Sequence, residues 1–264
     1  MLCYTESFME ISGQDSFLGQ HGMIHKYLKN LALELVKPEN LKEKMLPEMD
    51  KVARIHMRSW ASQGIVDVKE VASNMIFEYF AKKLISYDET KASKKLKDNY
   101  NAFRDGLTSF PLNIPGTAYH ACLQGQKKAI IVIKDIFEER KISNVNHGDY
   151  LDHLLEELNK EKPILNETMA ISFVFLLLFA AYETASSAIT LAVKFISDNL
   201  EVLVELMKEH EKIIENHEKG FEITWQEYKS MTFTHMVINE TVRLANIIPA
   251  VFRRAVTDVK MKGK

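Results

Sequence analysis

The sequence predicts a mainly α-helical fold, and three observations support that prediction. Glycine and proline are scarce, with 10 and 6 residues in a chain of 264. Apolar residues recur at intervals of three and four along most of the chain, whereas alternation of apolar and polar residues is rare. Hydrophobic residues make up 46% of the chain, which is enough to bury a large core. Because no linker or internal repeat interrupts the pattern, we expect one helical domain over residues 1–264.

The first half of the chain is predicted to contain five helices. The helical stripe over 21–36 ends before Pro38, and the next helix, over 41–60, has a regular body that begins near Pro47. Further helices are expected over 66–85 and 94–107. Two prolines and a glycine within 110–116 break the pattern, and a fifth helix follows over 117–141.

The second half is predicted to contain one long helix between shorter ones. After a short helix over 150–158, Asn166 is a candidate N-cap for a helix that runs to about Asp198. Its apolar stretch 169–181 is shorter than the roughly 20 residues needed to cross a bilayer, so we expect a buried core helix.

The C-terminal part is expected to begin with helices and to end with a little β structure. A charged helix over 200–217 would close at Gly220, and Thr224 with Glu227 forms a capping box. The last predicted helix covers 232–245. The segments 247–252 and 255–261 are expected to be extended.

Charge and cysteine content exclude several classes of function. The chain has 34 basic and 36 acidic residues, and a net charge of −2 provides no field to attract nucleic acid. Cys3 and Cys122 lie far apart without the spacing of a zinc site, so we expect two isolated thiols. Residues 1–20 lack a basic start followed by an apolar run, so we expect neither a signal peptide nor a membrane anchor there.

The long helix carries one candidate site, in the segment from Ala180 to Thr184. Ala180, Ala181 and Thr184 lie within about one turn, so small side chains share a face that a flat cofactor can approach closely. The Thr184 hydroxyl can bond back to the Ala180 carbonyl oxygen and loosen the helix there. Glu183 beside it can relay protons from solvent. The alternative is an ordinary buried helix with a solvated glutamate.

Glu240 and Arg243 form a second candidate, because residues three apart on a helix are neighbours. Such pairs are common on protein surfaces and contribute little there. The neighbouring Val237, Ile238 and Val242 predict partial burial, which would make the pair important for stability.

The segment 180–184, followed later in the chain by the pair Glu240 and Arg243, resembles the oxygen-binding helix followed by the Glu-x-x-Arg helix of a cytochrome P450. The stretch 225–244, the segment Phe252-Arg253-Arg254-Ala255 and the stretch 22–29 are similar to segments of plant P450s. The resemblance covers essentially the whole chain. It is strongest to the plant clan that oxidises sterols, brassinosteroids and triterpenoids, and within it to the family numbered 87. The fold class it implies is a mainly α fragment of the P450 fold.

The resemblance implies a role for each candidate residue. It implies that His25, Lys29 and Arg253 contact the haem propionates, with Ala180 and Ala181 beside the haem. Lys29 replaces the usual arginine and would bind as a point charge, and Ala181 replaces a common glycine. Glu183 and Thr184 match the catalytic acid and alcohol that deliver protons. Glu240 and Arg243 match the structural pair that holds the haem-binding region.

The resemblance also implies a function, which is haem-thiolate monooxygenase chemistry. The parent protein would oxidise a hydrophobic steroid-like or triterpenoid substrate with O2, taking electrons from NADPH through cytochrome P450 reductase. It would lie in the endoplasmic reticulum membrane through an anchor not found in this chain, in which we expect no transmembrane segment.

The haem ligand is the missing element of the pattern. In the family, a cysteine in a loop after the Glu-x-x-Arg helix binds the iron, and neither Cys3 nor Cys122 matches it, so we expect no metal ligand in this chain. We expect an internal or truncated fragment that lacks the N-terminal anchor and the cysteine loop and is itself inactive. The alternatives are a non-catalytic helical protein with a structural or protein-interaction role, and a helical lipid carrier.

Overall fold

The structure is a computed structural model that describes residues 6–13, 19–88, 92, 95–143, 145–216, 222–249, 255, 257 and 258. These residues divide into two compact units. Unit 1 comprises residues 1–32, 81–179 and 250–264, and unit 2 comprises residues 33–80 and 180–249. Three of the four unit boundaries fall within helices, and neither unit is a continuous stretch of sequence. The single helical domain over residues 1–264 stays a prediction, and each unit is described by its own helices.

The helices that contribute to unit 1 agree closely with the sequence prediction, apart from one extra short helix at the N-terminus. They are α1 (Glu6–Ser12), α2 (Gly22–Leu35), α6 (Leu96–Gly106), α7 (Ala118–Ser143), α8 (Tyr150–Leu158) and the first part of α9 (Glu167–Asp198). The predicted N-cap is confirmed, since Asn166 Oδ1 accepts the Met169 amide at 2.8 Å. Short α1 was missed because seven residues carry too little periodicity.

Besides the end of α2 and the second part of α9, unit 2 contains the remaining helices, except for residues 81–85 at the end of α5, which belong to unit 1. The remaining helices are α3 (Pro38–Asn40), a π-helical turn (Leu41–Met45), α4 (Leu46–Gln63), α5 (Val68–Ile85), α10 (Leu200–Asn216), α11 (Trp225–Ser230) and α12 (Thr232–Ala245). Pro47 lies in the first turn of α4, as predicted, because a proline needs no amide partner there. The capping box of Thr224 and Glu227 is also confirmed.

Two predictions need correction, one about β structure near the C-terminus and one about the length of the apolar segment of α9. The described residues contain no strand, so the predicted C-terminal β structure is not supported, and Ile247 and Ile248 form a bend. Most of 250–264, like the predicted cap Gly220, lies outside the described residues. Within the described part, α9 is long and apolar enough to cross a bilayer by length and composition alone, although 44% of its most apolar window is buried. The sequence prediction counted only the apolar stretch 169–181. It underestimated the length of the apolar segment of α9, because apolar residues continue past Glu183.

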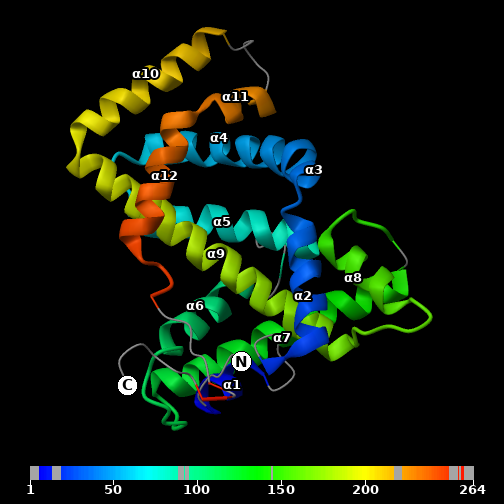
Figure 1. The fold of residues 1–264 in the computed structure, drawn as a ribbon. Coiled ribbons are helices and arrows are strands. Elements are labelled where there is room, and N and C mark those ends of the chain that lie inside the picture. The colour runs from blue at the N-terminus through cyan, green and yellow to red at the C-terminus, as the bar shows by residue number, and fades with distance from the viewer. Residues whose placement is uncertain are drawn as a thin grey trace. The chain divides into compact units, whose positions relative to one another are not determined.

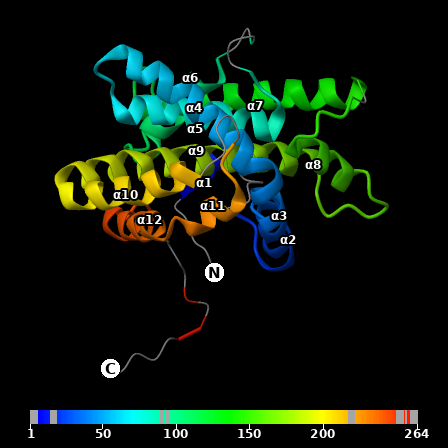
Figure 2. The same ribbon diagram turned by 90° about the horizontal axis from the view of Figure 1, so that it is seen from above.

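Unit 1 is built on a close crossing of α6 and α7, which lie side by side in both ribbon views (Figures 1 and 2). A Cβ atom placed on Gly106 would lie 2.3 Å from the Ala118 carbonyl oxygen. One placed on Gly125 would lie 2.5 Å from the Asn99 carbonyl oxygen. Glycine is required at both positions because any side chain would push the two backbones apart.

Aromatic side chains attach the first part of α9 to α6. The Tyr100 ring stacks on Phe175 with a centroid distance of 4.9 Å, and its hydroxyl donates to the Phe175 carbonyl oxygen at 3.0 Å. Phe103 packs edge-on against Phe175 and Phe179. Tyr100, Phe103 and Phe175 are almost completely buried, so this cluster is the centre of the unit 1 core.

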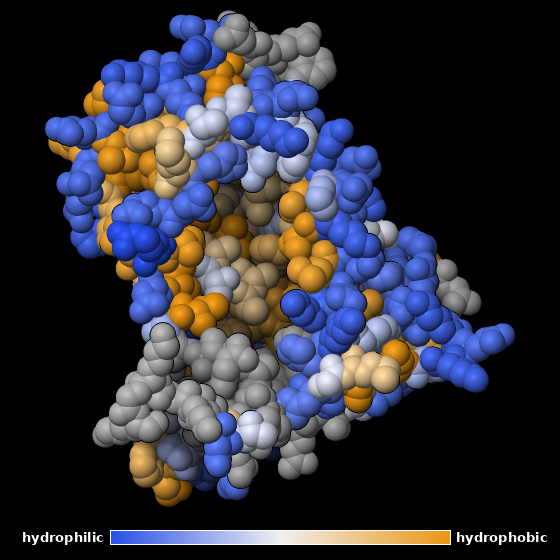
Figure 3. Space-filling model, in the orientation of Figure 1, coloured by the Kyte–Doolittle hydropathy of each residue, from blue (hydrophilic) through white to orange (hydrophobic). Residues whose placement is uncertain are grey.

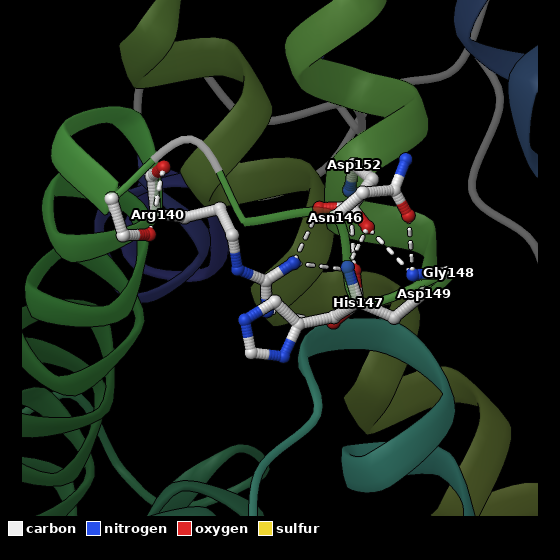
Figure 4. Close-up of polar contacts among 7 residues, drawn as sticks. Arg140, Asn146, His147, Gly148, Asp149 and Asp152 are labelled. Atoms are coloured by element: carbon white, nitrogen blue, oxygen red, sulfur yellow. Dashed lines mark hydrogen bonds and ion pairs between the residues drawn. The ribbon is translucent and has the colours of Figure 1, made fainter.

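A buried ion cluster closes the connection between α7 and α8 (Figure 4). Arg140 donates to both carboxylate oxygens of Asp149, at 3.0 and 2.9 Å, and to Asp152 at 2.5 Å. The second oxygen of Asp152 accepts the backbone amides of His147 and Gly148. Asp149 also caps α8, because its side chain accepts the Asp152 amide. One arginine thereby fixes both the loop and the start of α8.

Candidate functional site

The candidate site on α9 begins with a hydroxyl that bonds back to its own helix. Thr184 Oγ1 donates to the Ala180 carbonyl oxygen at 2.7 Å, which is the bond that the sequence predicts. Ala180 is exposed, and Ala181 and Thr184 are half-buried. Within unit 2, Tyr182 is fully buried against the edge of Phe77, with a centroid distance of 5.2 Å. That contact fixes the rotation of α9 at the site.

Thr184 lines a cavity of about 420 Å³ within unit 2. The rest of its lining is mostly apolar and comes from α9 and from the end of α12: Ala185, Ala188, Val242, Asn246, Ile247 and Ile248. Asn246 ends α12 with φ 44° and ψ 47°, a left-handed conformation that asparagine tolerates. The turn brings the two isoleucines that follow α12 to the face of α9.

Sequence reasoning missed most of this lining. Ala188 lies four residues after Thr184 and therefore on the same helix face, a spacing that could have identified it. The residues after α12 gave no signal, because only the turn at Asn246 brings them to the cavity. Glu183 is half-buried and is not among the described residues that line the cavity.

The structure contradicts the predicted burial of the Glu240 and Arg243 pair. The ion pair itself forms, with two hydrogen bonds of 2.7 and 2.6 Å from the guanidinium to the carboxylate. However, the two side chains are 55% and 67% exposed, because this face of α12 is turned to solvent in the described part of the chain. The hydrogen bonds from Arg243 lower the pKa of Glu240 below its ordinary value.

The predicted propionate contacts fall on α2 and on a segment that is not described. His25 is half-buried and Lys29 is exposed, and both lie on one face of the helix. Arg253 lies outside the described residues. His25 and Lys29 belong to unit 1, whereas Thr184 and Glu240 belong to unit 2.

Cys122 does not fit the role of haem ligand. It is fully buried in α7, and its thiol donates to the Phe103 carbonyl oxygen at 3.2 Å. Burial raises its pKa to about 11, so the thiolate that a haem iron requires is disfavoured. The part of the chain that the structure describes contains no cluster of three metal-binding side chains. By contrast, the small, apolar α9 face around Thr184 fits contact with a flat haem.

Comparison with known proteins defines the class of this protein. The cytochrome P450 family model matches residues 10–264, so the chain belongs to the cytochrome P450 family. The cyanobacterial P450 120A1 with bound retinoic acid shares the fold, with a TM-score of 0.85 at 20% identity over 100% of this chain and 58% of its own.

The relatives that this chain resembles include plant P450s of the group numbered 87. The chain is 49% identical to cytochrome P450 87A3 of rice, over 98% of this chain and 51% of the relative. It is 35% identical to the β-amyrin 16α-hydroxylase of Maesa lanceolata and 34% identical to the cucurbitadienol 11-hydroxylase of Siraitia grosvenorii. These alignments cover 99% and 98% of this chain, and 56% and 55% of the respective relatives. The chain thus spans about half the length of the curated relatives it matches.

Proposed function

We propose that this chain is part of a haem-thiolate monooxygenase that oxidises a triterpenoid or steroid-like substrate. The proposal rests on one observation. The hydroxyl of Thr184 is held at the wall of an apolar cavity by its hydrogen bond to the Ala180 carbonyl oxygen. When bound, haem supplies the activation of O2 and the oxidising power. The residues of this chain bind, orient and deliver protons.

Thr184 and Glu183 are the residues we assign to proton delivery. The Thr184 hydroxyl can release its bond to Ala180 and donate to a ligand in the cavity, and it can take a proton back on the same oxygen. Glu183 is about 100° further round the helix and half-buried, so its carboxyl group can exchange protons with solvent. Together they connect solvent to the cavity wall.

The lining of the cavity supports a hydrophobic substrate. Ala185, Ala188, Val242 and Ile248 offer no charged group, so they favour an apolar ligand and exclude water. The names of two relatives refer to β-amyrin and cucurbitadienol, which are triterpenoids. We infer a substrate of this class.

The remaining assignments follow from the resemblance to the family. His25, Lys29 and Arg253 bind the haem propionates, Ala180 and Ala181 allow the haem to approach α9, and Glu240 with Arg243 holds the haem-binding region. Neither Cys3 nor Cys122 is assigned as the axial cysteine. NADPH supplies electrons through cytochrome P450 reductase, and the full-length protein works at the endoplasmic reticulum membrane.

The test is expression of the full-length protein with a haem precursor, beside the 264-residue chain. We expect the reduced full-length protein to give the red-shifted carbon monoxide complex of a thiolate-bound haem, and the 264-residue chain not to give it. With reductase and NADPH, the full-length protein should convert a triterpenoid to a product with one more oxygen atom. Failure of the full-length protein to bind haem would exclude the proposal and favour a non-catalytic role.

A further inference from the structure

Helix α2 presents different chemistry on opposite sides. His25 and Lys29 are four residues apart and share one side. Tyr27 lies midway between them in sequence, and at 100° per residue it is about 160° around the helix axis from each. It borders the buried side of α2, which carries Leu28 and Leu31. Tyr27 is therefore placed to control which way the His25 side faces.

Tyr27 links α2 to α8 within unit 1. Its hydroxyl donates to Glu157 Oε2 at 2.8 Å, and Lys160 Nζ donates to the other carboxylate oxygen at 2.5 Å. Glu157 is only 8% exposed, although it is a charged residue. The two helices lie next to each other in Figure 1. A buried carboxylate is thus satisfied from both sides, and one of its donors comes from α2.

The charges on this contact make it a strong hydrogen bond. Burial alone would raise the pKa of Glu157, but the hydrogen bonds from Lys160 and Tyr27 outweigh it and lower that pKa. Burial and the adjacent carboxylate raise the pKa of Tyr27 well above its ordinary value. Tyr27 therefore stays protonated as the donor and Glu157 stays ionised as the acceptor, the arrangement of a charge-assisted bond.

We propose that Tyr27 and Glu157 are positioning residues for haem binding, because they fix the rotation of α2 about its own axis. Apolar contacts such as those of Leu28 and Leu31 are non-directional, whereas a hydrogen bond is directional. Lys29 contributes a point charge without the fixed fork of an arginine, so it does little to orient the helix. The orientation of His25 and Lys29 is set from the opposite side of α2. This inference rests on the proposed function.

The test compares Tyr27→Phe with a matched control in the haem-loaded full-length protein. Tyr27→Phe removes only the hydroxyl, and we expect haem release to a scavenging apoprotein to become about tenfold faster, the lower end for a lost bond to a charged group. Tyr119→Phe removes a comparable bond, from the Tyr119 hydroxyl of α7 to Glu10 at 2.6 Å. It should leave the release rate within about twofold of wild type.

A second variant and a second measurement separate positioning from general stability. Glu157→Gln keeps an oxygen that can accept from Tyr27 but loses the charge, so its haem release should lie between wild type and Tyr27→Phe. The double variant should release haem no faster than Tyr27→Phe alone, because both changes act on α2 through the same bond from Tyr27 to Glu157, and the bond from Lys160 that Glu157→Gln also weakens does not involve α2. Hydrogen exchange in the haem-free protein should quicken in α2 for Tyr27→Phe and not for Tyr119→Phe.

The outcomes distinguish this inference from the proposed function. Equal acceleration of haem release by Tyr27→Phe and Tyr119→Phe would overturn positioning and indicate a general loss of stability. Unchanged hydrogen exchange in α2 would show that the pair does not anchor the helix, whatever the haem result. If wild-type protein binds no haem at all, the proposed function fails, and the haem role of Tyr27 fails with it.

Discussion

At the residue scale, Thr184 and Cys122 show how local contacts decide chemistry. Both side chains donate a hydrogen bond to a backbone carbonyl oxygen. Thr184 does so at the wall of a cavity, where the hydroxyl remains available to a ligand. Cys122 does so in the core between α6 and α7, where no ligand can reach it. Their surroundings therefore support the proposed role of Thr184 in proton delivery and give Cys122 a packing role.

The Thr184 hydroxyl is predicted to control how much product forms per NADPH consumed. Thr184→Val keeps the size of the side chain but removes the proton donor, so product per NADPH should fall by about tenfold or more in the full-length protein. Thr184→Ser should retain most of it. The measurement is product yield against NADPH oxidation.

A matched control for this prediction lies further along the same helix. Thr190 Oγ1 donates to the Ser186 carbonyl oxygen at 2.8 Å, which repeats the back-bond of Thr184. Thr190 is not among the described residues that line the cavity. Thr190→Val should therefore leave the yield unchanged, and an equal loss in both variants would contradict a specific role for Thr184.

Cys122 is predicted to be unreactive in the folded chain. With a pKa of about 11, roughly one thiol in a thousand is ionised at pH 8, and burial blocks access to it. In a Cys3→Ser background, alkylation by iodoacetamide should be slow in buffer and fast in denaturant. Rapid labelling of the native chain would show that the α6 and α7 interface opens readily.

At the element scale, the connection from α7 to α8 depends on Arg140. The side chains of Arg140, Asp149 and Asp152 are 5%, 3% and 12% exposed, so two carboxylates and one guanidinium share a nearly dry site. Burial alone would raise the pKa of Asp152, but hydrogen bonds from Arg140 and from the Gly148 and His147 amides lower it overall. A buried cluster of this kind is costly to disrupt in part.

Arg140→Met is predicted to destabilise the fold by about 3–5 kcal/mol, because it strands two buried carboxylates. Arg54→Met is the control, since Arg54 is 51% exposed and pairs with Asp50 on the surface of α4. Its loss should cost at most about 1 kcal/mol. Urea unfolding of both variants measures the difference, and equal costs would contradict a structural role for the buried cluster.

The same cluster predicts a pH dependence of stability with a defined sign. The folded-state pKa of Asp152 lies below its unfolded value, so the unfolded chain binds more protons between the two values. Its contribution is therefore complete above the unfolded value of about 3.9 and is lost as the pH falls through the folded value. The stability gap between wild type and Arg140→Met should narrow below about pH 4. A gap that stays constant as the pH falls would contradict this linkage.

At the scale of the whole molecule, unit 2 exposes much apolar surface. Large apolar side chains on one face of α10 are 38–70% exposed: Leu200, Leu203, Val204, Met207 and Ile214. On α12, Met236, Ile238, Val242 and Leu244 are 49–58% exposed. Figure 3 shows apolar surface over both helices. Contiguous exposed apolar surface of this kind favours association.

The isolated 264-residue chain is therefore predicted to self-associate through the apolar face of α10. Replacing Leu203 and Met207 by lysine should shift the chain toward monomer at micromolar concentration, as measured by sedimentation. Lysines at Glu201 and Glu211, exposed positions of the same helix, serve as the control for added charge. If both pairs of substitutions act alike, charge rather than the apolar face would explain the effect.

The sequence by itself determined the helices and the family. The spacing of apolar residues and the positions of proline and glycine predicted almost every helix. Residue types at the helix ends and within the helix predicted the caps at Asn166 and Thr224 and the back-bond of Thr184. All of these depend on neighbours within a few residues. The order of the Thr184 and Glu240 motifs, together with the stretches around them, indicated a P450, and the family match confirms that membership.

Only the tertiary structure decided what each side chain faces. The exposure of Glu240 and Arg243, the cavity that joins Thr184 to Ile247 and Ile248, and the link from Tyr27 to Glu157 all depend on contacts between residues distant in the chain. Periodicity shows that a helix has an apolar side, but it cannot show which surface meets that side. Burial and cavities exist only once helices have packed, so they are properties of the fold and not of any segment.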